Sequence, residues 1–259
     1  MDAKLQLVII SIISYTLVGV GLYFSKKYIK NEKLKNWVFI IVSLATVILH
    51  YTGMFYNMSQ TDNYVLEDTM FLPVYPCNVM MWINFALCFL IFKRKKVFNI
   101  LAGFAFFAGS LCAFIGLSFN INFMNNPNLA DYDILKGLLS HITLFFSCVY
   151  LFVMGYVKVD TINNLISCLI GAIIFILCGL YTTAMLKALN RADVNAMFLK
   201  APYEKIPFFN FYTISIIGVV ILLSITTLYE KKFYPVEKVW YNRLRNKNNK
   251  QIEGNENNA

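Results

Sequence analysis

Three side chains of this largely apolar chain are candidates for chemistry, namely one of its six cysteines and its two histidines. Cys77 stands near the start of one apolar run, and the two histidines, His50 and His141, lie in two other apolar runs. Ionisable side chains within apolar spans are costly and usually face a cavity or a polar partner. A neighbouring imidazole can remove the proton of a thiol and make it a nucleophile. We therefore expect the three residues to meet, with Cys77 as nucleophile.

The residue before the cysteine supports this expectation. Proline favours the first position of a helix, where its missing N–H removes no hydrogen bond. If a helix begins at Pro76, Cys77 lies in its first turn, where the helix dipole favours a thiolate. Backbone N–H groups at the same helix start can stabilise an oxyanion. The alternative is that Cys77 is a packed apolar residue and that the histidines form interhelical hydrogen bonds.

The composition places these residues in a membrane. Of the 259 residues, 58% are hydrophobic and 14% are charged, whereas a soluble domain has about 25% charged residues. Several apolar stretches reach about 20 residues, enough for a helix to cross a ~30 Å hydrocarbon core. We predict an all-α polytopic membrane protein with seven transmembrane helices in residues 1–232, followed by a polar, basic, disordered tail in 233–259. The predicted spans are 5–25, 37–56, 71–92, 97–118, 134–157, 162–186 and 208–229.

The basic residues predict an orientation. Lys and Arg cluster in 26–36, in 93–96 and after residue 230, whereas 57–70 and 119–133 contain none. The positive-inside rule then places the N-terminus outside and the C-terminus in the cytoplasm. The net charge of +9 follows from this distribution, and no nucleic-acid-binding motif accompanies it. The Asn-, Lys- and Ile-rich usage suggests a bacterial genome, so we expect the bacterial cytoplasmic membrane.

This topology places the three reactive residues at a similar depth. His50 lies 13 residues past Trp37, the interfacial aromatic residue that opens its span, or about 20 Å from the inner face. Cys77 and His141 lie six and seven residues into spans that run inward, or about 10 Å below the outer face. We therefore predict a site in the outer half of the membrane.

One outer segment departs from the charge rule. Residues 187–205 fall on the predicted outer side but include Lys187, Arg191, Lys200 and Lys205. Positive charge there can hold a phosphate or a carboxylate. The alternative is an ordinary solvated loop.

Metal and cofactor alternatives stay open at this stage. A set of His50, His141 and Cys77 fits the ligand types of zinc, and two histidines can ligate one haem. The six cysteines contain no C-x-x-C pair, so neither a zinc ribbon nor a disulfide framework is predicted. The thiol mechanism itself requires no metal and no cofactor.

Three stretches of the chain resemble a known family. Leu72-Pro73-Val74-Tyr75-Pro76-Cys77 is similar to an L-P-L-H-L-C motif, Ser140-His141 with the following Tyr150-Leu151 is similar to G-H and Y-L, and Asn195–Pro202 is similar to N-Y-M-F-L followed by K-P. These are motifs of the YwaF-type family of bacterial multi-pass membrane proteins, and the resemblance covers about residues 35–230. Tyr75 stands where that family has His, and Asn78 where it commonly has Asp.

The YwaF-type family is in turn distantly similar to eukaryotic multi-pass proteins implicated in cysteine-dependent acyl transfer onto lysophospholipids. This resemblance implies that Cys77 carries the acyl group and that His141 acts as base. It implies a phospholipid or lysophospholipid substrate, with no cofactor.

Two main functional hypotheses follow. The first is an acyltransferase or hydrolase acting on membrane phospholipid, with Cys77, His141 and His50 catalytic. Its predicted substrate-binding residues are Asn78, Tyr75, Arg191, Asn195 and Lys200. The second is a non-enzymatic binder or carrier of a lipid or small anion that uses the same outer-leaflet cavity. An assembly partner without a cavity is the third reading.

Overall fold

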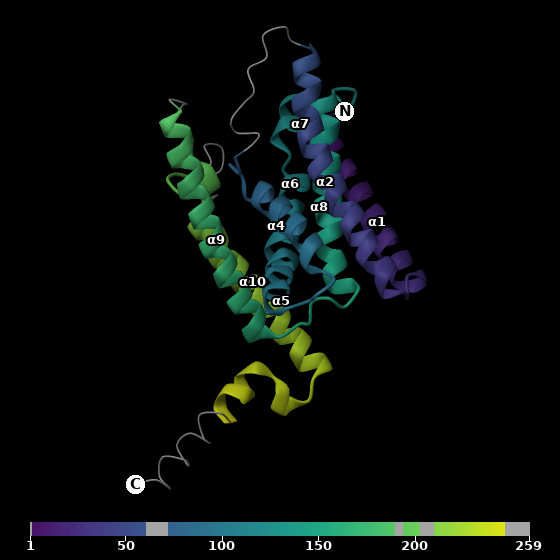
Figure 1. Cartoon of the computed structure of the whole chain (residues 1–259), viewed down its shortest axis with the longest axis vertical. Helices are drawn as coiled ribbons and strands as arrows, with labels where there is room; N and C mark the ends of the chain where they lie inside the picture. The colour runs from purple at the N-terminus through teal and green to yellow at the C-terminus, as the bar shows by residue number, and fades with distance from the viewer. Residues whose placement is uncertain (1, 61–71, 190–193, 203–209, 247–259) are drawn as a thin grey trace.

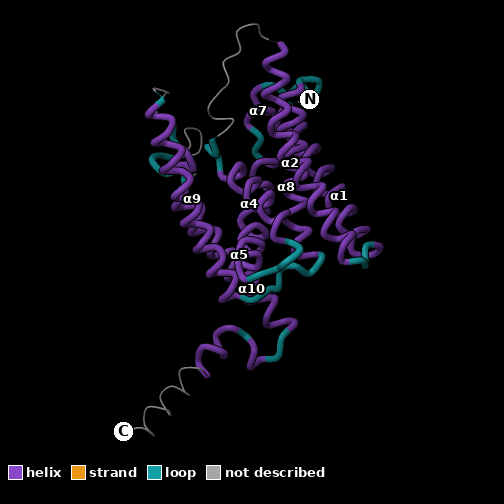
Figure 2. The backbone as a smooth tube through the Cα atoms, viewed as in Figure 1, coloured by secondary structure: helices purple, strands orange, loops and turns teal. Residues whose placement is uncertain are grey.

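Helices account for all regular structure in the described part of the chain. The computed structural model describes residues 2–60, 72–189, 194–202 and 210–246, and Figure 2 shows helices and loops but no strand within them. The elements are α1 (Ala3–Tyr28), α2 (Glu32–Gln60), α4 (Pro76–Leu90), α5 (Lys96–Phe104), the π-helix η1 (Ala105–Gly109), α6 (Ser110–Ser118), α7 (Ile121–Asn125), α8 (Tyr132–Val153), α9 (Thr161–Ala188), the 3₁₀-helix η2 (Ala196–Phe198), α10 (Phe211–Phe233) and the 3₁₀-helix η3 (Val236–Lys238). The predicted all-α class is confirmed.

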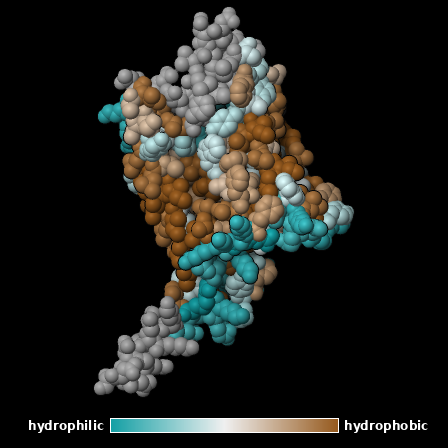
Figure 3. All heavy atoms as spheres, viewed as in Figure 1, coloured by the Kyte–Doolittle hydropathy of each residue, from teal (hydrophilic) through white to brown (hydrophobic). Residues whose placement is uncertain are grey.

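Six helical segments among the described residues are long and apolar enough to cross a membrane. They are Ala3–Tyr28, Glu32–Gly53, Lys96–Asn125, Tyr132–Val153, Thr161–Ala188 and Phe211–Phe233. An apolar surface covers these helices, and a hydrophilic layer lies at the end of the bundle from which the C-terminal segment extends (Figure 3). The chain is therefore a multi-pass membrane protein.

The helix at the predicted third span is shorter than the others. α4 has 15 residues, or about 22 Å at 1.5 Å per residue, whereas a spanning helix needs about 20 residues. The number of seven spans, the orientation of the termini and the domain boundary at residue 232 therefore stay predictions.

α4, α5 and α6 occupy the centre of the bundle (Figure 1). α1, α2 and α8 lie on one side of this centre, and α9 and α10 lie on the other. Fully buried apolar side chains of α4, including Met80 and Leu87, pack into the main core. The predicted fourth span is confirmed as helical, but a π-helix interrupts it between α5 and α6, a feature that recurs near functional sites.

α2 and α8 form the most extensive helix pair, and their contacts define an antiparallel register. Tyr56 contacts Tyr132, with ring centroids 4.9 Å apart. Two to three turns further along, Thr46 Oγ1 hydrogen-bonds Thr143 Oγ1 at 2.9 Å. Because α2 ascends as α8 descends, residues near 50 on α2 lie opposite residues near 140 on α8. This register brings the two histidine-bearing segments together.

The opposite end of the bundle contains a buried carboxylate that joins three segments. Glu230 of α10 is fully buried and accepts hydrogen bonds from the backbone N–H of Thr161 at 2.7 Å and of Trp240 at 2.8 Å. Beside it, Arg243 donates to the N-cap residue Asp160 of α9 at 2.8 Å. These bonds fix α9, α10 and the first turns after α10. Of the predicted tail, residues 233–246 are described, and the rest lies outside the described residues.

The Asp160–Arg243 pair predicts an acid-dependent loss of stability. Burial acts to raise the pKa of the Asp160 carboxyl, but the hydrogen bond from Arg243 and those from the start of α9 outweigh it and hold the pKa below its usual value. A group with a lowered pKa stabilises the fold at pH values above its unfolded pKa, and this contribution is lost as the pH falls through the folded pKa. Asp160→Asn should therefore lower the thermal midpoint in detergent at pH 7. The difference from the wild type should begin to shrink near pH 4, about the usual pKa of an aspartate, and should vanish only below the lowered folded pKa.

Arg243→Met supplies the matched control. It should lower the midpoint at pH 7 by more than Asp160→Asn does, because Arg243 also lies 3.6 Å from Oε1 of the buried Glu230. The double variant should show less than the sum of the two effects, because the two variants share the Asp160–Arg243 interaction. Additive effects, or a difference that persists in acid, would contradict the assignment.

Candidate functional site

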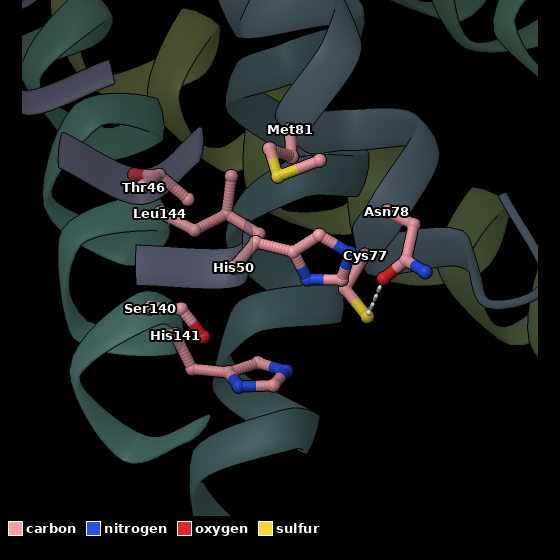
Figure 4. Close-up of a pocket in the computed structure, with 8 residues that line it drawn as sticks. All are labelled: Thr46, His50, Cys77, Asn78, Met81, Ser140, His141 and Leu144. Carbon is pink, nitrogen blue, oxygen red and sulfur yellow. Dashed lines mark hydrogen bonds between the residues drawn. The ribbon is translucent and has the colours of Figure 1, made fainter. Parts of the chain in front are cut away.

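One pocket contains the three residues singled out in the sequence. It is lined by Thr46, His50, Cys77, Asn78, Met81, Ser140, His141 and Leu144, which come from α2, α4 and α8. In Figure 4 the Cys77 thiol points into the space bordered by the His50 and His141 rings. The cavity is about 30 Å³, room for about one water molecule. The structure therefore brings Cys77, His50, His141 and Asn78 together, as the predicted depths required.

Cys77 lies in the first turn of its helix. α4 begins at Pro76, and Tyr75 at the N-cap is extended, with φ −106° and ψ 150°. The prediction that the helix begins at Pro76 is confirmed. The first N–H groups of a helix have no intrahelical acceptor, so the backbone here presents partial positive charge to the thiol.

His141 is held in one tautomer by its own helix. Its Nδ1 lies 2.8 Å from the carbonyl oxygen of Gly137. Because a carbonyl oxygen only accepts hydrogen bonds, Nδ1 carries the proton and Nε2 presents its lone pair. Ser140 donates to the same carbonyl at 2.9 Å. An imidazole with a free Nε2 is the form that can take a proton from a thiol.

Gly116 of α6 makes room for the His141 ring. A Cβ placed at Gly116 would overlap Cδ2 and Nε2 of the imidazole. The ring therefore packs directly on the backbone of α6, which limits its rotation. Gly116 acts on the site through His141.

Polar side chains surround the other two reactive groups. The Cys77 thiol donates to Oδ1 of Asn78 at 3.4 Å, so the Asn78 amide nitrogen is a side-chain donor beside the thiol. The His50 ring makes an edge contact with Tyr51, with centroids 5.1 Å apart. One turn before His50, Thr46 also lines the pocket, while its hydroxyl is hydrogen-bonded to Thr143 at 2.9 Å. The site thus combines a thiol, two imidazoles and hydrogen-bond donors.

Three other predicted substrate-binding residues, Tyr75, Asn195 and Lys200, do not line this pocket. Tyr75 is half exposed, and its ring lies 6.0 Å from that of Phe198. Lys200 is exposed and does not line the pocket. Arg191 lies outside the described residues. Among the five predicted substrate contacts, Asn78 lines the cavity.

Asn195 organises its own loop. Its Oδ1 accepts from the N–H of Lys200 at 2.9 Å, and its Nδ2 donates to the carbonyl of Ala201 at 2.6 Å. Within this loop Met197 has a left-handed backbone, with φ 56°, and its N–H donates to the carbonyl of Val74 at 2.8 Å. The loop therefore fixes the chain that leads into α4, and its contribution to the site is positional.

Some residues of the site were not predicted. Thr46 lies four residues before His50, so helical spacing was an available signal for it. Ser140 is adjacent to His141, and adjacent residues of a helix do not share a face, so spacing gave no signal there. Gly116 had no such signal, because its role depends on the packing of α6 against α8. The zinc alternative finds no support in the described residues, where no group of three His, Cys, Asp or Glu side chains is placed to hold a metal ion.

The close packing of Gly116 predicts a specific sensitivity. Gly116→Ala should displace the imidazole and lower the free energy of unfolding by about 1–3 kcal/mol, as overpacking in a core does. Thermal unfolding in detergent measures this loss. Gly137→Ala is the matched control, because nothing lies within 4 Å of a Cβ at Gly137, and it should be neutral or stabilising. Equal destabilisation by both variants would contradict the role of Gly116.

Comparisons with known proteins identify the family. No curated protein and no solved structure gives a significant match. The model of the TMEM164 family matches residues 3–229, nearly the whole described bundle. The chain belongs to the TMEM164 family of multi-pass membrane proteins.

Proposed function

We propose that this protein is a membrane-embedded acyltransferase or hydrolase that acts on phospholipid or lysophospholipid through Cys77. One observation carries the proposal: a thiol in the first turn of a helix shares a small cavity with a histidine whose Nδ1 is hydrogen-bonded and whose Nε2 is free. A thiol and an imidazole that share a cavity are the parts of a nucleophile–base pair, which acts when the two come within hydrogen-bond reach. The resemblance of the Cys77 and His141 motifs to those of the YwaF-type family and its acyltransferase relatives adds support.

The first half of the reaction forms a thioester. Nε2 of His141 takes the thiol proton, and Sγ of Cys77 attacks the carbonyl carbon of an acyl ester. The bond between that carbon and the ester oxygen then breaks. The imidazolium returns its proton to the departing oxygen, which leaves as the hydroxyl of a lysophospholipid. The acyl group remains on Cys77.

The second half transfers the acyl group. A hydroxyl of an acceptor lysophospholipid, or water, loses its proton to His141 and attacks the thioester carbonyl. The Cys77 sulfur leaves and regains a proton from the imidazolium. Acceptor and water differ only in the attacking oxygen, so the same residues serve transfer and hydrolysis.

His50 and Asn78 stabilise charge in this scheme. Both carbonyl additions place a negative charge on oxygen, and donors aimed at that oxygen lower the barrier. The Asn78 amide nitrogen and the backbone N–H of Cys77 are such donors beside the sulfur. The backbone N–H of Asn78 is not counted among these donors, because it is bonded to the carbonyl of Tyr75 at 3.0 Å. Arg191 and Lys200 on the predicted outer loop are proposed contacts for a lipid phosphate.

The size of the cavity limits what enters it. A volume of about 30 Å³ accommodates the reacting carbonyl group but not an acyl chain. We propose that the chain stays in the surrounding lipid while the ester group reaches the thiol, in the outer leaflet of a bacterial cytoplasmic membrane.

A lipid or small-anion carrier is the second candidate. The observation that favours it is the hydrogen bond from the Cys77 thiol to Asn78, which satisfies the thiol without either histidine. In a carrier Cys77 packs, and the histidines bind the ligand.

Replacing the thiol separates the two candidates. Wild-type protein in detergent, exposed to a phospholipid mixture, should gain an acyl mass that hydroxylamine removes, and Cys77→Ser should not gain it. Intact-protein mass spectrometry measures the adduct. Cys168→Ser is the matched control, because Cys168 is also partly buried but belongs to α9, and it should acylate like the wild type. Lipid binding without an adduct on the wild type would support the carrier.

Removing the base should slow acylation. His141→Gln keeps a polar side chain of similar size but cannot take the thiol proton, so the rate of adduct formation should fall by about 10²- to 10⁴-fold. A time course of adduct mass measures the rate, with thermal midpoints to show that the variant is folded. His50→Gln should have a smaller effect. An unchanged rate in folded His141→Gln would exclude His141 as the base.

A further inference from the structure

A lysine of α8 lies between two helices close to the pocket. Its ammonium group occupies the space left by a glycine of α2, because a Cβ at Gly53 would overlap Nζ, Cε and Cδ of Lys136. The Lys136 side chain is 16% exposed, although lysine usually extends into water. Buried lysines need a partner for their charge.

The partner that the structure provides is weak. Nζ of Lys136 lies 3.3 Å from Oδ1 of Asp133, three residues earlier on α8. Oδ1 of Asp133 is buried and accepts no hydrogen bond. The ammonium and the carboxylate are therefore in ionic contact, but no N–H of Lys136 is directed at that oxygen. An ammonium has three donors. Among the described residues Asp133 is the one ion-pair partner of Lys136, so this cation has capacity for a further acceptor.

The helix register places this cation next to the reactive groups. Gly53 lies three residues beyond His50 on α2, and Lys136 lies four residues before Ser140 on α8. Each offset is about one helical turn, or roughly 5 Å. The Tyr56–Tyr132 contact lies about one turn further toward the end of the bundle. Lys136 therefore lies between the pocket and the nearer end of the bundle.

We propose that Lys136 is an anion-binding group of the acyl-transfer site, in addition to the two outer-loop cations, and that it contacts the phosphate of a phospholipid or lysophospholipid whose ester group reaches Cys77. This inference rests on the proposed function and names a contact that it did not include. The phosphate displaces Asp133 as the main partner, and the Asp133 side chain, which is 40% exposed, turns to water. A charge-assisted hydrogen bond to phosphate is stronger than a neutral one.

The geometry matches the order of groups in a lipid. In a glycerophospholipid the phosphate lies nearer the membrane surface than the ester carbonyls do, and glycerol carbons separate the two. Lys136 likewise lies nearer the end of the bundle than Cys77 and His141 do. A lipid in its normal orientation can therefore present phosphate to Lys136 and an ester to the thiol, whichever leaflet this end faces.

Binding to a protein that cannot be acylated tests the inference. Full-length protein carrying Cys77→Ser is titrated in detergent with lysophosphatidylglycerol and, in parallel, with an uncharged monoacylglycerol of the same chain. Lys136→Met should weaken binding of the phosphate probe by about 10- to 100-fold, the effect of a charge-assisted hydrogen bond. It should leave binding of the uncharged probe unchanged.

Three companion variants make the result specific. Lys136→Arg should retain the preference for phosphate, which also shows that the position tolerates substitution. Gly53→Ala keeps the charge but displaces it, so it should lose the preference. Lys4→Met, an exposed lysine at the start of α1, removes the same charge and should have no effect. Competition with inorganic phosphate shows whether the site binds a lipid phosphate or free phosphate. If millimolar inorganic phosphate displaces the lysophosphatidylglycerol probe, the site is assigned to free phosphate.

The outcomes distinguish this inference from the proposed function. If folded Lys136→Met keeps the full preference for the phosphate probe, Lys136 is not the anion contact, whatever Cys77 does. If the preference is lost but the wild-type thiol never acquires an acyl group, the anion site stands and the acyltransferase does not. Loss of binding of both probes in Lys136→Met would also overturn the inference, because it would show a general structural defect.

Discussion

The antiparallel register of α2 against α8 is the constraint on which the candidate site depends. Both helices carry a histidine, and a rotation of about 100° accompanies each residue along a helix. A shift of one residue in either helix would therefore turn an imidazole away from the cavity. The Thr46–Thr143 hydrogen bond and the Tyr56–Tyr132 contact hold the register on both sides of the histidines. Hydrogen bonds of this kind replace the hydrophobic effect, which does not drive helix association in lipid.

The thiol comes from a third helix and is positioned by a different set of contacts. Pro76 sets the start of α4, and the bond from Met197 to the carbonyl of Val74 fixes the chain just before it. Two φ angles in the left-handed region, at Met197 and Phe198, show that this loop accepts an unfavourable backbone for that contact. The α2–α8 pair thus supplies the imidazoles, and the α9–α10 side of the protein positions the nucleophile.

The sequence was informative about elements and depth, and less so about contacts between elements. Apolar length predicted the helices, proline chemistry predicted the start of α4, and counting residues from the membrane boundary predicted that Cys77, His50 and His141 lie at similar depth. The substrate contacts were less accessible. The basic outer loop suggested Lys200, but Lys200 does not line the pocket, because the net charge of a segment does not specify where its side chains point. Asn195 forms hydrogen bonds within its own loop. Gly116 and Gly53 matter through the side chains that pack on them, and this depends on tertiary structure that no local pattern encodes.

The shortness of α4 has a consequence for the bilayer itself. A helix of about 22 Å is several ångströms shorter than a hydrocarbon layer of ~30 Å, and such hydrophobic mismatch is relieved by local thinning of the bilayer. Cys77 lies at one end of this short helix. α4 is central but exposes Trp82 and Phe89 on one face, and lipids beside that face would sit lower than their neighbours, with their headgroup region drawn toward the thiol. The protein would then deform the membrane to bring polar groups to a buried sulfur, so that the thickness of the host bilayer becomes a determinant of access to the site.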